Sequence, residues 1–411
     1  MYTDLNKDLT DEQKAVKLRT HEFAAQVLRP ASIELDKMTP EETIAAGSRL
    51  RDVFRTAYEE EFHLRGFPEA LGGAHLGPME SHIVNEEMGW GSADFSIALS
   101  VTSFPFAFAS SRQDPQLMKD VVMPFVNDRK GEYIGCWAIT EPGHGSDTLM
   151  PGTSMWTKPE IHYGLTATLD GDDYVLNGQK SAWVSNGTIA THALTFLGTD
   201  RKRGMSGGGV ALVPLDLPGV TKGPPLNKLG QRALNQGEIF FDDVRIPKSY
   251  MLADAENYTM VIDAVLAGAN AYMGSTFTGL ARAALEEAIT YTKNRVQGGV
   301  PISEHQLVQK KLFDMFVKVE TARQLSRATV LYNHGIFPPG TQYSIASKVY
   351  CTQAAFEVAS DALQLHGGYG LTKDMLIEKL FRDARASMIE DGSNDILSLT
   401  AAQKILDQYV I

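Results

Sequence analysis

Apolar positions recur with two different periods along this chain, and the change of period divides it into three parts. Up to about residue 130, and again from about residue 251, apolar residues recur at i, i+3, i+4 and i+7, which predicts amphipathic helices. Between these parts, short runs rich in β-branched and aromatic residues are separated by Gly, Asn, Asp and Pro, which predicts an antiparallel β domain. We therefore expect an α+β protein, mainly α, with domains at 1–133, 134–250 and 251–411.

Local signals predict where several elements begin and end. Thr10 is expected to cap the first helix and Pro30 to end it. Asp114 followed by Pro115 is expected to start another helix. The sequence DGDD at 170–173 is expected to be a hairpin turn, because it lacks the spacing of a calcium-binding loop. The long helices of the last part are expected to pack as a bundle, and the order helical, β, helical disfavours a Rossmann nucleotide-binding fold.

Composition excludes several classes of function. The chain has 411 residues, and a formal net charge of −12 argues against general binding of nucleic acid or of an anionic membrane. Two cysteines, outside any CxxC pair, indicate neither a disulfide scaffold nor a metal site. The polar N-terminus lacks the features of a signal peptide. The sequence also contains no run of about 18 apolar residues, so no membrane span is expected. We therefore expect a cytoplasmic protein.

Four motifs carry candidate chemistry. In chain order they are CWAITEPGHGSD, KSAWVSNG, LQLHGGYGLTKDMLIEKLFRDAR and MIEDGSNDI. This set, in this order, resembles the acyl-CoA dehydrogenase family of flavoproteins over nearly the whole chain. The resemblance implies an N-terminal helical domain, a middle antiparallel β-barrel domain and a C-terminal four-helix bundle. It also implies FAD as cofactor and an acyl-CoA substrate, which loses an α-proton to a carboxylate base and a β-hydride to flavin N5.

The resemblance also assigns residues to the cofactor. Trp137, Ile139 and Thr140 would line the edge of the flavin ring, and Trp183 and Ser185 would shield it. Trp183 could instead be a core tryptophan, and Thr140 could be a turn hydroxyl. Arg295 would reach the flavin pyrophosphate, and the glycines of QLHGGYG would meet the adenosine end of a neighbouring subunit's FAD; Gly367 could also cap a helix. The further cofactor candidates of this group are Gln306, Gln364, Gly367, Gly368, Ser393 and Asp395.

The catalytic base is expected in the stretch MIEDGSNDI. Matched through Gly392, the base position holds Asp391, where the family usually has Glu, and Glu390 stands where the family usually has an aromatic residue. Gly392 suits the sharp turn that the base needs. Glu390 and Asp94 are alternative bases, Asp94 being also a candidate helix cap.

Substrate contacts are assigned by the same resemblance. Ser146 would contact CoA, although a turn hydroxyl is the alternative, and Asp391 and Gly392 would contact the thioester. Asn270 replaces the arginine that usually orients the base. Small residues at 269–276 and the bulky FPFAF at 104–108 predict a wide, short pocket for a branched, cyclic or functionalised acyl group.

The cofactor assignment implies a homo-oligomer, commonly a tetramer in this family, and an electron-transfer flavoprotein as electron acceptor. The altered base leaves other chemistry open on the same scaffold: 1,4-elimination to a conjugated diene, oxidase or desulfinase activity. A non-catalytic flavin- or CoA-binding homologue is the remaining alternative. The family motifs and the carboxylate before Gly392 argue against it.

Overall fold

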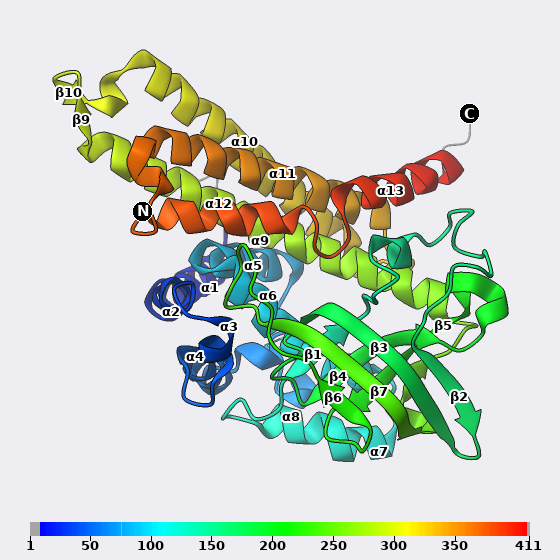
Figure 1. Cartoon of the computed structure of the whole chain (residues 1–411). Coiled ribbons are helices and arrows are strands. Elements are labelled where there is room, and N and C mark those ends of the chain that lie inside the picture. The colour runs from blue at the N-terminus through cyan, green and yellow to red at the C-terminus, as the bar shows by residue number, and fades with distance from the viewer. Residues whose placement is uncertain (1–8, 75, 409–411) are drawn as a thin grey trace.

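The computed structural model describes residues 9–74 and 76–408 as three parts that follow one another along the chain (Figure 1). Helices form the first part, strands the second, and long helices the third, so the predicted fold class is confirmed. The predicted domain boundaries stay predictions. The polar N-terminal start, residues 1–8, lies outside the described residues.

The first part is a cluster of mostly short helices. Its elements are α1 (Asp11–Phe23), η1 (Ala24–Leu28), α2 (Arg29–Leu35), α3 (Pro40–Ile44), α4 (Arg49–Glu59), η2 (Phe62–Leu64), η3 (Glu69–Leu71), α5 (Pro78–Gly91), α6 (Ala93–Ser111), α7 (Pro115–Leu117), η4 (Met118–Val122) and α8 (Met123–Asn127). Thr10 caps α1 through a reciprocal hydrogen-bonded pair with Gln13, as predicted. Asp114 caps α7 by accepting from two backbone N–H groups, which confirms the second predicted start.

The prediction that Pro30 ends the first helix is wrong. The chain runs from α1 through one π-helical turn, η1, into α2, and Pro30 lies in the first turn of α2. A proline has no N–H to donate and clashes with the carbonyl four residues before it in a regular helix. In the wider turn, Arg29 N–H bonds to Ala24 O, five residues back, and the helical path continues past Pro30.

The second part is one eight-stranded sheet with the order β6-β7-β3-β1-β4-β5-β8, in which β2 also pairs with β3 and β4. Because β2 pairs with both β3 and β4, the strands β3, β1, β4 and β2 close into a ring, while β6 and β8 are the ends of the longer path. The sheet is mixed rather than purely antiparallel, because β1 pairs with β4 in parallel. Its elements are β1 (Gly135–Ala138), η5 (Ser146–Leu149), β2 (Thr166–Asp170), β3 (Asp173–Ser185), β4 (His192–Gly198), η6 (Arg201–Gly207), β5 (Gly208–Pro214), β6 (Val220–Lys222), β7 (Gln236–Pro247), η7 (Lys248–Tyr250) and β8 (Met251–Ala253).

The DGDD sequence forms the turn between β2 and β3, as predicted. Asp170 and Asp173 are paired across the two strands, and Gly171 has a φ of 65°. Glycine adopts this left-handed conformation without the steric cost that a Cβ brings.

The third part is built around α9, which contacts both α11 and α10 and also α5 of the first part. Figure 1 shows α10 and α11 lying along α9, with the β9–β10 hairpin at one end of the bundle. The elements are α9 (Tyr258–Asn294), β9 (Val296–Gln297), β10 (Val300–Pro301), η8 (Ile302–Glu304), α10 (Gln306–Asn333), α11 (Thr341–His366), η9 (Gly367–Leu371), α12 (Leu376–Ser387) and α13 (Asn394–Gln408).

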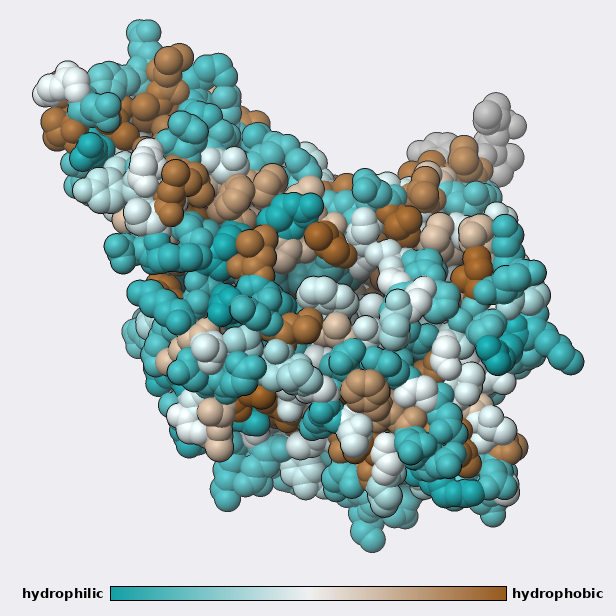
Figure 2. All heavy atoms as spheres, in the orientation of Figure 1, coloured by the Kyte–Doolittle hydropathy of each residue, from teal (hydrophilic) through white to brown (hydrophobic). Residues whose placement is uncertain are grey.

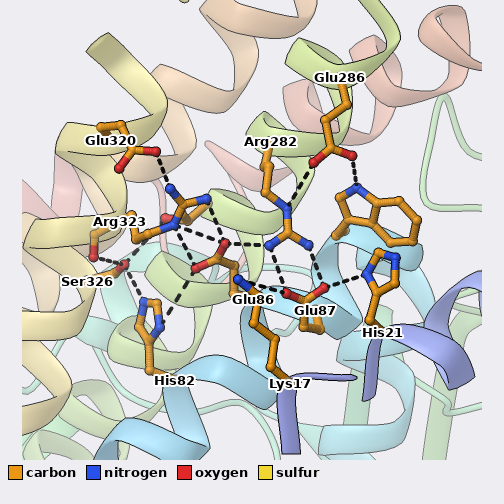
Figure 3. A network of polar contacts seen from close by, with 12 residues as sticks. Lys17, His21, His82, Glu86, Glu87, Arg282, Glu286, Glu320, Arg323 and Ser326 are labelled. Carbon is orange, nitrogen blue, oxygen red and sulfur yellow. Dashed lines mark hydrogen bonds and ion pairs between the residues drawn. The ribbon is translucent and has the colours of Figure 1, made fainter. Parts of the chain in front are cut away.

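A buried ionic network joins the first part to the bundle (Figure 3). Arg282 of α9 donates to Glu86 Oε1 at 2.9 Å and to Glu87 Oε1 at 2.8 Å. Arg323 of α10 donates to Glu86 Oε1 at 3.0 Å, and His21 of α1 lies 2.8 Å from Glu87 Oε2. Burial alone would raise the pKa of Glu86, but Arg323 and Arg282 outweigh it and hold that pKa well below the usual range. We name Glu86, Glu87, Arg282 and Arg323 the α5 ionic cluster.

Among the described residues, α6 is the one helix that is long and apolar enough to cross a membrane. Within its most apolar window, 61% is buried inside the protein, as expected for a core helix.

Candidate active site

A tight turn between α12 and α13 carries the neighbouring carboxylates Glu390 and Asp391. Asp391 has a φ of 51° and Gly392 a φ of 98°, so both adopt left-handed backbone conformations. A Cβ on Gly392 would lie 2.8 Å from Leu397 Cδ2 and 3.1 Å from Leu149 Cδ1. The turn therefore requires glycine directly after Asp391.

Contacts from η5 and from α11 fix the turn in place. The N–H of Ser393 donates to Ser146 Oγ at 2.9 Å, which ties the turn to η5 of the β region. Lys348 of α11 donates to the carbonyl of Gly392 at 2.6 Å and to Asn394 Oδ1 at 2.8 Å. The structure thus brings Asp391, Gly392, Ser393 and Ser146 together and adds a buried lysine.

The two carboxylates of the turn differ in their surroundings. Burial raises the pKa of Asp391 to about 6, and the Lys348 ammonium limits the shift. Burial raises the pKa of Glu390 to about 7, and Gln231 donates a hydrogen bond to its Oε1 that opposes the shift. No residue in the described ranges donates a hydrogen bond to the carboxylate of Asp391, a residue that is only partly buried. Asp391 is therefore the carboxylate that is free to take a proton from a ligand.

The backbone of the turn offers hydrogen-bond donors as well. Within residues 9–74 and 76–408, the N–H groups of Asp391 and Gly392 donate to no acceptor. Unused N–H groups beside a carboxylate can stabilise negative charge that develops on a ligand oxygen.

Asp94, the third candidate base, is buried in a different polar cluster. Its carboxylate accepts from Ser32 Oγ at 3.0 Å, from the Ala233 N–H at 3.1 Å and from Lys379 Nζ at 3.2 Å. Burial alone would raise the pKa of Asp94, but Lys379 and these hydrogen bonds lower it. A saturated, ionised carboxylate of this kind holds elements together and is a weak proton acceptor.

The residues predicted to line the flavin edge lie on neighbouring strands. Trp137 of β1 pairs with Ser185 of β3, and Trp137 Nε1 is buried without a hydrogen-bond partner among the described residues. Trp183 leaves 56% of its surface exposed, which is unusual for a core tryptophan. Buried Lys180 donates to the carbonyl of Ile139 at 3.0 Å, and the Ser181 N–H donates to the carbonyl of Thr140 at 2.9 Å. An aromatic edge with an unused N–H donor and an exposed indole suits a planar polar ring.

Of the other predicted cofactor residues, Ser393 and Asp395 lie at the turn and at the start of α13, and the remainder lie at the far end of the bundle. Arg295 follows α9, Gln306 begins α10, and the Gly367 N–H donates to the carbonyl of Gln364 at the end of α11, which confirms the helix cap expected at Gly367. A cavity of about 370 Å³ opens here, and Figure 1 shows this end of the bundle opposite the strands. Its lining includes Tyr291, Arg295, His366, Gly367, Gly368 and Tyr369. The predicted cofactor residues on the strands and those at the far end of the bundle therefore form separate groups within one chain.

Two predicted residues make no hydrogen bond to the turn within the described chain. Asn270 is buried in α9, where its Nδ2 donates to Leu266 O at 2.9 Å and its Oδ1 is unpartnered among the described residues. Asp395 is exposed in the first turn of α13.

Two residues of the site were missed from the sequence. Lys348 lies in an amphipathic stretch, where a lone lysine looks like a surface residue. Tyr272 of α9 bonds to Ser96 of α6 at 2.6 Å between hydroxyl oxygens, and Asp391 lies close enough to contribute to the raised pKa of Tyr272, after burial. The sequence did hold a sign that Lys348 is buried, because Ile345, Val349 and Cys351 around it are apolar. It held no comparable sign for Tyr272.

Comparison with known proteins agrees with this arrangement. Family models for the acyl-CoA dehydrogenase N-terminal, middle and C-terminal domains match residues 10–117, 136–244 and 261–406. The fold and site define an oxidoreductase that uses FAD, the cofactor of this group of flavoproteins. The chain belongs to the acyl-CoA dehydrogenase family.

Individual relatives extend over nearly the whole chain. The short-chain specific acyl-CoA dehydrogenase of Rattus norvegicus is 32% identical over 413 residues, covering 98% of this chain and 92% of the relative. The cyclohexane-1-carbonyl-CoA dehydrogenase of Geobacter metallireducens is 29% identical, covering 97% of this chain and 98% of the relative. The structure of butyryl-CoA dehydrogenase from Megasphaera elsdenii superposes with a TM-score of 0.83 at 25% identity, covering 99% of this chain and 100% of that one.

Proposed function

We propose that this protein dehydrogenates an acyl-CoA thioester and that Asp391 removes the α-proton. The observation that carries the proposal is a partly accessible carboxylate with a raised pKa and no hydrogen-bond donor among the described residues. A general base works best when its pKa lies near the working pH. Ser146 and Lys348 hold the turn by its backbone, so the carboxylate itself stays free.

The same turn supplies stabilisation for the proton transfer. An α-proton beside a thioester becomes acidic enough to remove only if charge on the thioester oxygen is stabilised. The unused N–H groups of Asp391 and Gly392 are suited to this role. Asp391 would then take the proton while its own N–H binds the thioester oxygen.

The FAD would accept the β-hydride of the acyl group at flavin N5. The strand residues fit the flavin ring, because Trp137 offers a buried, unpaired N–H and Trp183 offers an exposed indole face. At the far end of the bundle, Arg295 fits a pyrophosphate, and the open backbone of Gly367 and Gly368 fits an adenosine, since added Cβ atoms there would meet nothing within 4 Å. The strands and this end of the bundle lie on opposite sides of the structure, which favours an FAD site completed by a second subunit (Figure 1).

A homo-oligomer is therefore part of the proposal, with a tetramer as the expected form. Large apolar side chains are exposed on α10, among them Leu307 at 83% and Phe313 at 63%. Figure 2 shows hydrophobic side chains gathered at the end of the molecule where β9, β10 and α10 lie. Exposed apolar patches of this kind are typical of subunit contacts.

For the substrate, we infer a short acyl group that is branched, cyclic or functionalised. Relatives named for short-chain and for cyclohexane-1-carbonyl substrates support this range. An electron-transfer flavoprotein is the proposed electron acceptor, and the cytoplasm the proposed location.

An anaerobic titration of the FAD-loaded protein tests the proposal. Linear, branched and cyclic acyl-CoAs would be added to wild type, Asp391→Asn and Glu390→Gln, with bleaching of the oxidised flavin band as readout. We expect at least one thioester to bleach wild type and Glu390→Gln, and to leave Asp391→Asn oxidised. Equal bleaching of Asp391→Asn would show that the base lies elsewhere.

A further inference from the structure

A buried glutamine from the β region reaches the turn that carries the proposed base. Gln231 lies in the loop between β6 and β7, and its Nε2 donates to Glu390 Oε1 and, at 3.1 Å, to the carbonyl of Asp383. Because Nε2 faces two oxygen atoms, these hydrogen bonds fix the orientation of the amide. The amide oxygen, Oε1, is buried and has no hydrogen-bond partner among the described residues. A buried acceptor without a donor is costly, so a donor for this atom is expected.

The backbone of the loop is shaped to bring this amide to the turn. Gln231 has a φ of 51°, a left-handed conformation that is uncommon for a residue with a Cβ. Its N–H donates to Asp383 Oδ1, and Arg382 donates to the carbonyl of Leu229 at 2.7 Å. A Cβ on Gly230 would lie 2.6 Å from the carbonyl carbon of Arg382, so the loop and α12 meet backbone to backbone. A strained residue that its surroundings hold in this way is typical of functional positions.

The carboxyl group of Glu390 has no cation bonded to it. Burial raises its pKa to about 7, and the charge of Asp391 adds to the shift, whereas Lys228 and Lys348 oppose it. Both lysines donate to other acceptors, and within the described chain Gln231 is the residue that donates to the Glu390 carboxylate. The charged groups of the neighbouring elements are Asp391 in the turn, Lys348 on α11, Asp383 and Lys379 on α12, Asp94 on α6 and Lys228 in the loop.

Three of these charges bind one another instead of Glu390. Lys379 donates to Asp383 Oδ2 and, at 3.2 Å, to Asp94 Oδ2. The group that faces Glu390 most closely is therefore a neutral amide with one free acceptor.

We propose that Glu390 keeps its proton in the resting protein and donates it to Gln231 Oε1, so that Gln231 is a positioning residue and Asp391 carries the single negative charge of the turn. The amide and the acid then form a closed pair. Gln231 Nε2 donates to Glu390 Oε1, and the O–H at Glu390 Oε2 donates to Gln231 Oε1, which gives the buried acceptor its donor. The inference rests on the proposed function only where it concerns Asp391 as the base.

The proton on Glu390 matters because a second charge would disturb the base. When two carboxylates share a site, each resists ionisation of the other, and one pKa rises strongly. An amide that only donates would favour ionised Glu390, whereas an acceptor within reach of the acid O–H favours the neutral form. With Glu390 held neutral by the second of these contacts, Asp391 ionises at lower pH and is ready to accept a proton.

Infrared spectroscopy tests the protonated acid without turnover. Difference spectra of the FAD-loaded wild type between pH 5 and pH 9 should contain the carbonyl band of a buried carboxylic acid that disappears near pH 7. The same spectra of Glu390→Gln should lack this band, which assigns it to Glu390. A wild-type spectrum with no band that depends on Glu390 would overturn the proposal.

The variant Gln231→Leu tests the role of the amide. Without the acceptor, Glu390 should lose its infrared band about one pH unit lower, and its charge should raise the pKa of Asp391. The pH profile of flavin reduction in a single turnover should then move to higher pH by about one unit. Gln179→Leu is the matched control, because it removes another half-buried glutamine that donates to a glutamate, Glu238, at 2.9 Å, and it should leave the profile unmoved.

A double variant separates this role from a purely structural one. In Gln231→Leu combined with Glu390→Gln, Asp391 has no ionisable neighbour in the turn, so the profile should match that of Glu390→Gln alone. A shift that persists in the double variant, or a Gln231→Leu profile that stays in place or moves to lower pH, contradicts the acid–amide pair. Flavin content and the unfolding temperature report whether each variant is folded, and the infrared comparison of wild type with Glu390→Gln decides if Gln231→Leu is not.

The outcomes distinguish this inference from the proposed function. If the Glu390 band is present and no thioester bleaches the flavin, the acid–amide pair stands and the proposed reaction fails. If thioesters bleach the flavin and the band is absent, the reaction stands and the pair fails.

Discussion

Two pairs of neighbouring carboxylates in this protein differ in how their charges are balanced. In the α5 ionic cluster, Glu86 and Glu87 face two arginines, which outweigh burial and lower the pKa of both. In the turn after α12, burial raises the pKa of Glu390 and of Asp391; Lys348 opposes both shifts, and Lys228 opposes the shift of Glu390 alone. The first group stays ionised at neutral pH, whereas the second lies close to the point where it takes up a proton.

The difference separates carboxylates that stabilise the fold from a carboxylate that can react. Ionised, fully paired groups join α5 to α9 and α10 (Figure 3). Asp391 has one opposing charge, which contacts the backbone of its turn rather than its carboxylate. Perturbed, incompletely paired groups of this kind are typical of functional sites.

Breaking the α5 ionic cluster should have the largest effect on stability. Arg282→Met removes the arginine that pairs with both Glu86 and Glu87 and leaves Arg323 as the one arginine of the cluster, so we expect a loss of about 3–5 kcal/mol in the free energy of unfolding. Urea denaturation followed by circular dichroism measures this change. The control is Lys310→Met, which breaks an exposed pair with Asp314 and should cost no more than about 0.5 kcal/mol. Equal losses in the two variants would contradict the structural role of the cluster.

Removing Lys348, the lysine of α11 that holds the turn, should have an intermediate effect, which is on the rate of flavin reduction. Lys348 holds the carbonyl of Gly392 and lowers the pKa of Asp391, so Lys348→Met should loosen the turn and raise that pKa further. We expect flavin reduction to slow by about 10-fold and its pH dependence to move to higher pH by about one unit.

Stopped-flow reduction by a reactive thioester at several pH values measures both changes. Lys318→Met, which removes a lysine paired with Glu357 on the surface of the bundle, is the control and should leave the profile unmoved. A slower reaction with no shift in pH would mean that Lys348 acts only through structure.

The smallest effect is expected at Glu390. Folding raises the pKa of Glu390 to about 7, so the folded protein favours the neutral acid. The folded state therefore loses stability as the pH rises from the ordinary pKa of a glutamate toward 7. Glu390→Gln mimics the neutral acid and should raise stability at pH 8 by on the order of 1 kcal/mol, with little change at pH 4. Flavin reduction should stay within about 3-fold of wild type. A loss above about 100-fold would make Glu390 the better candidate base.

The layout of the fold was predictable because it follows local patterns. Hydrophobic periodicity separated helices from strands, and Thr10, Asp114 and the DGDD turn act through residues close to them in sequence. The parallel pairing of β1 with β4 was not predictable, since a strand's own pattern does not name its partner. The passage of Pro30 through a continuous helical path depends on a single wider turn before it.

The candidate site was predictable only in its turn. Gly392 marked a sharp bend beside two carboxylates, and the structure has that bend. Lys379, which ties down Asp94, is 285 residues away from it in sequence, and Lys348 reaches Gly392 from another helix. Such pairings arise from tertiary packing, so residue patterns alone do not reveal which carboxylate remains free.

The most direct test of the central claim is the pH dependence of flavin reduction in a single turnover. Wild type and Asp391→Asn, both loaded with FAD, would be mixed anaerobically with the thioester that bleaches wild type most strongly. If Asp391 is the base, the wild-type rate should rise with pH through an apparent pKa near 6 and then level off, because only the ionised carboxylate accepts the proton. Asp391→Asn should be slower by about 10²- to 10⁴-fold at every pH. A variant that reduces its flavin at the wild-type rate, with the same pH profile, would contradict the account.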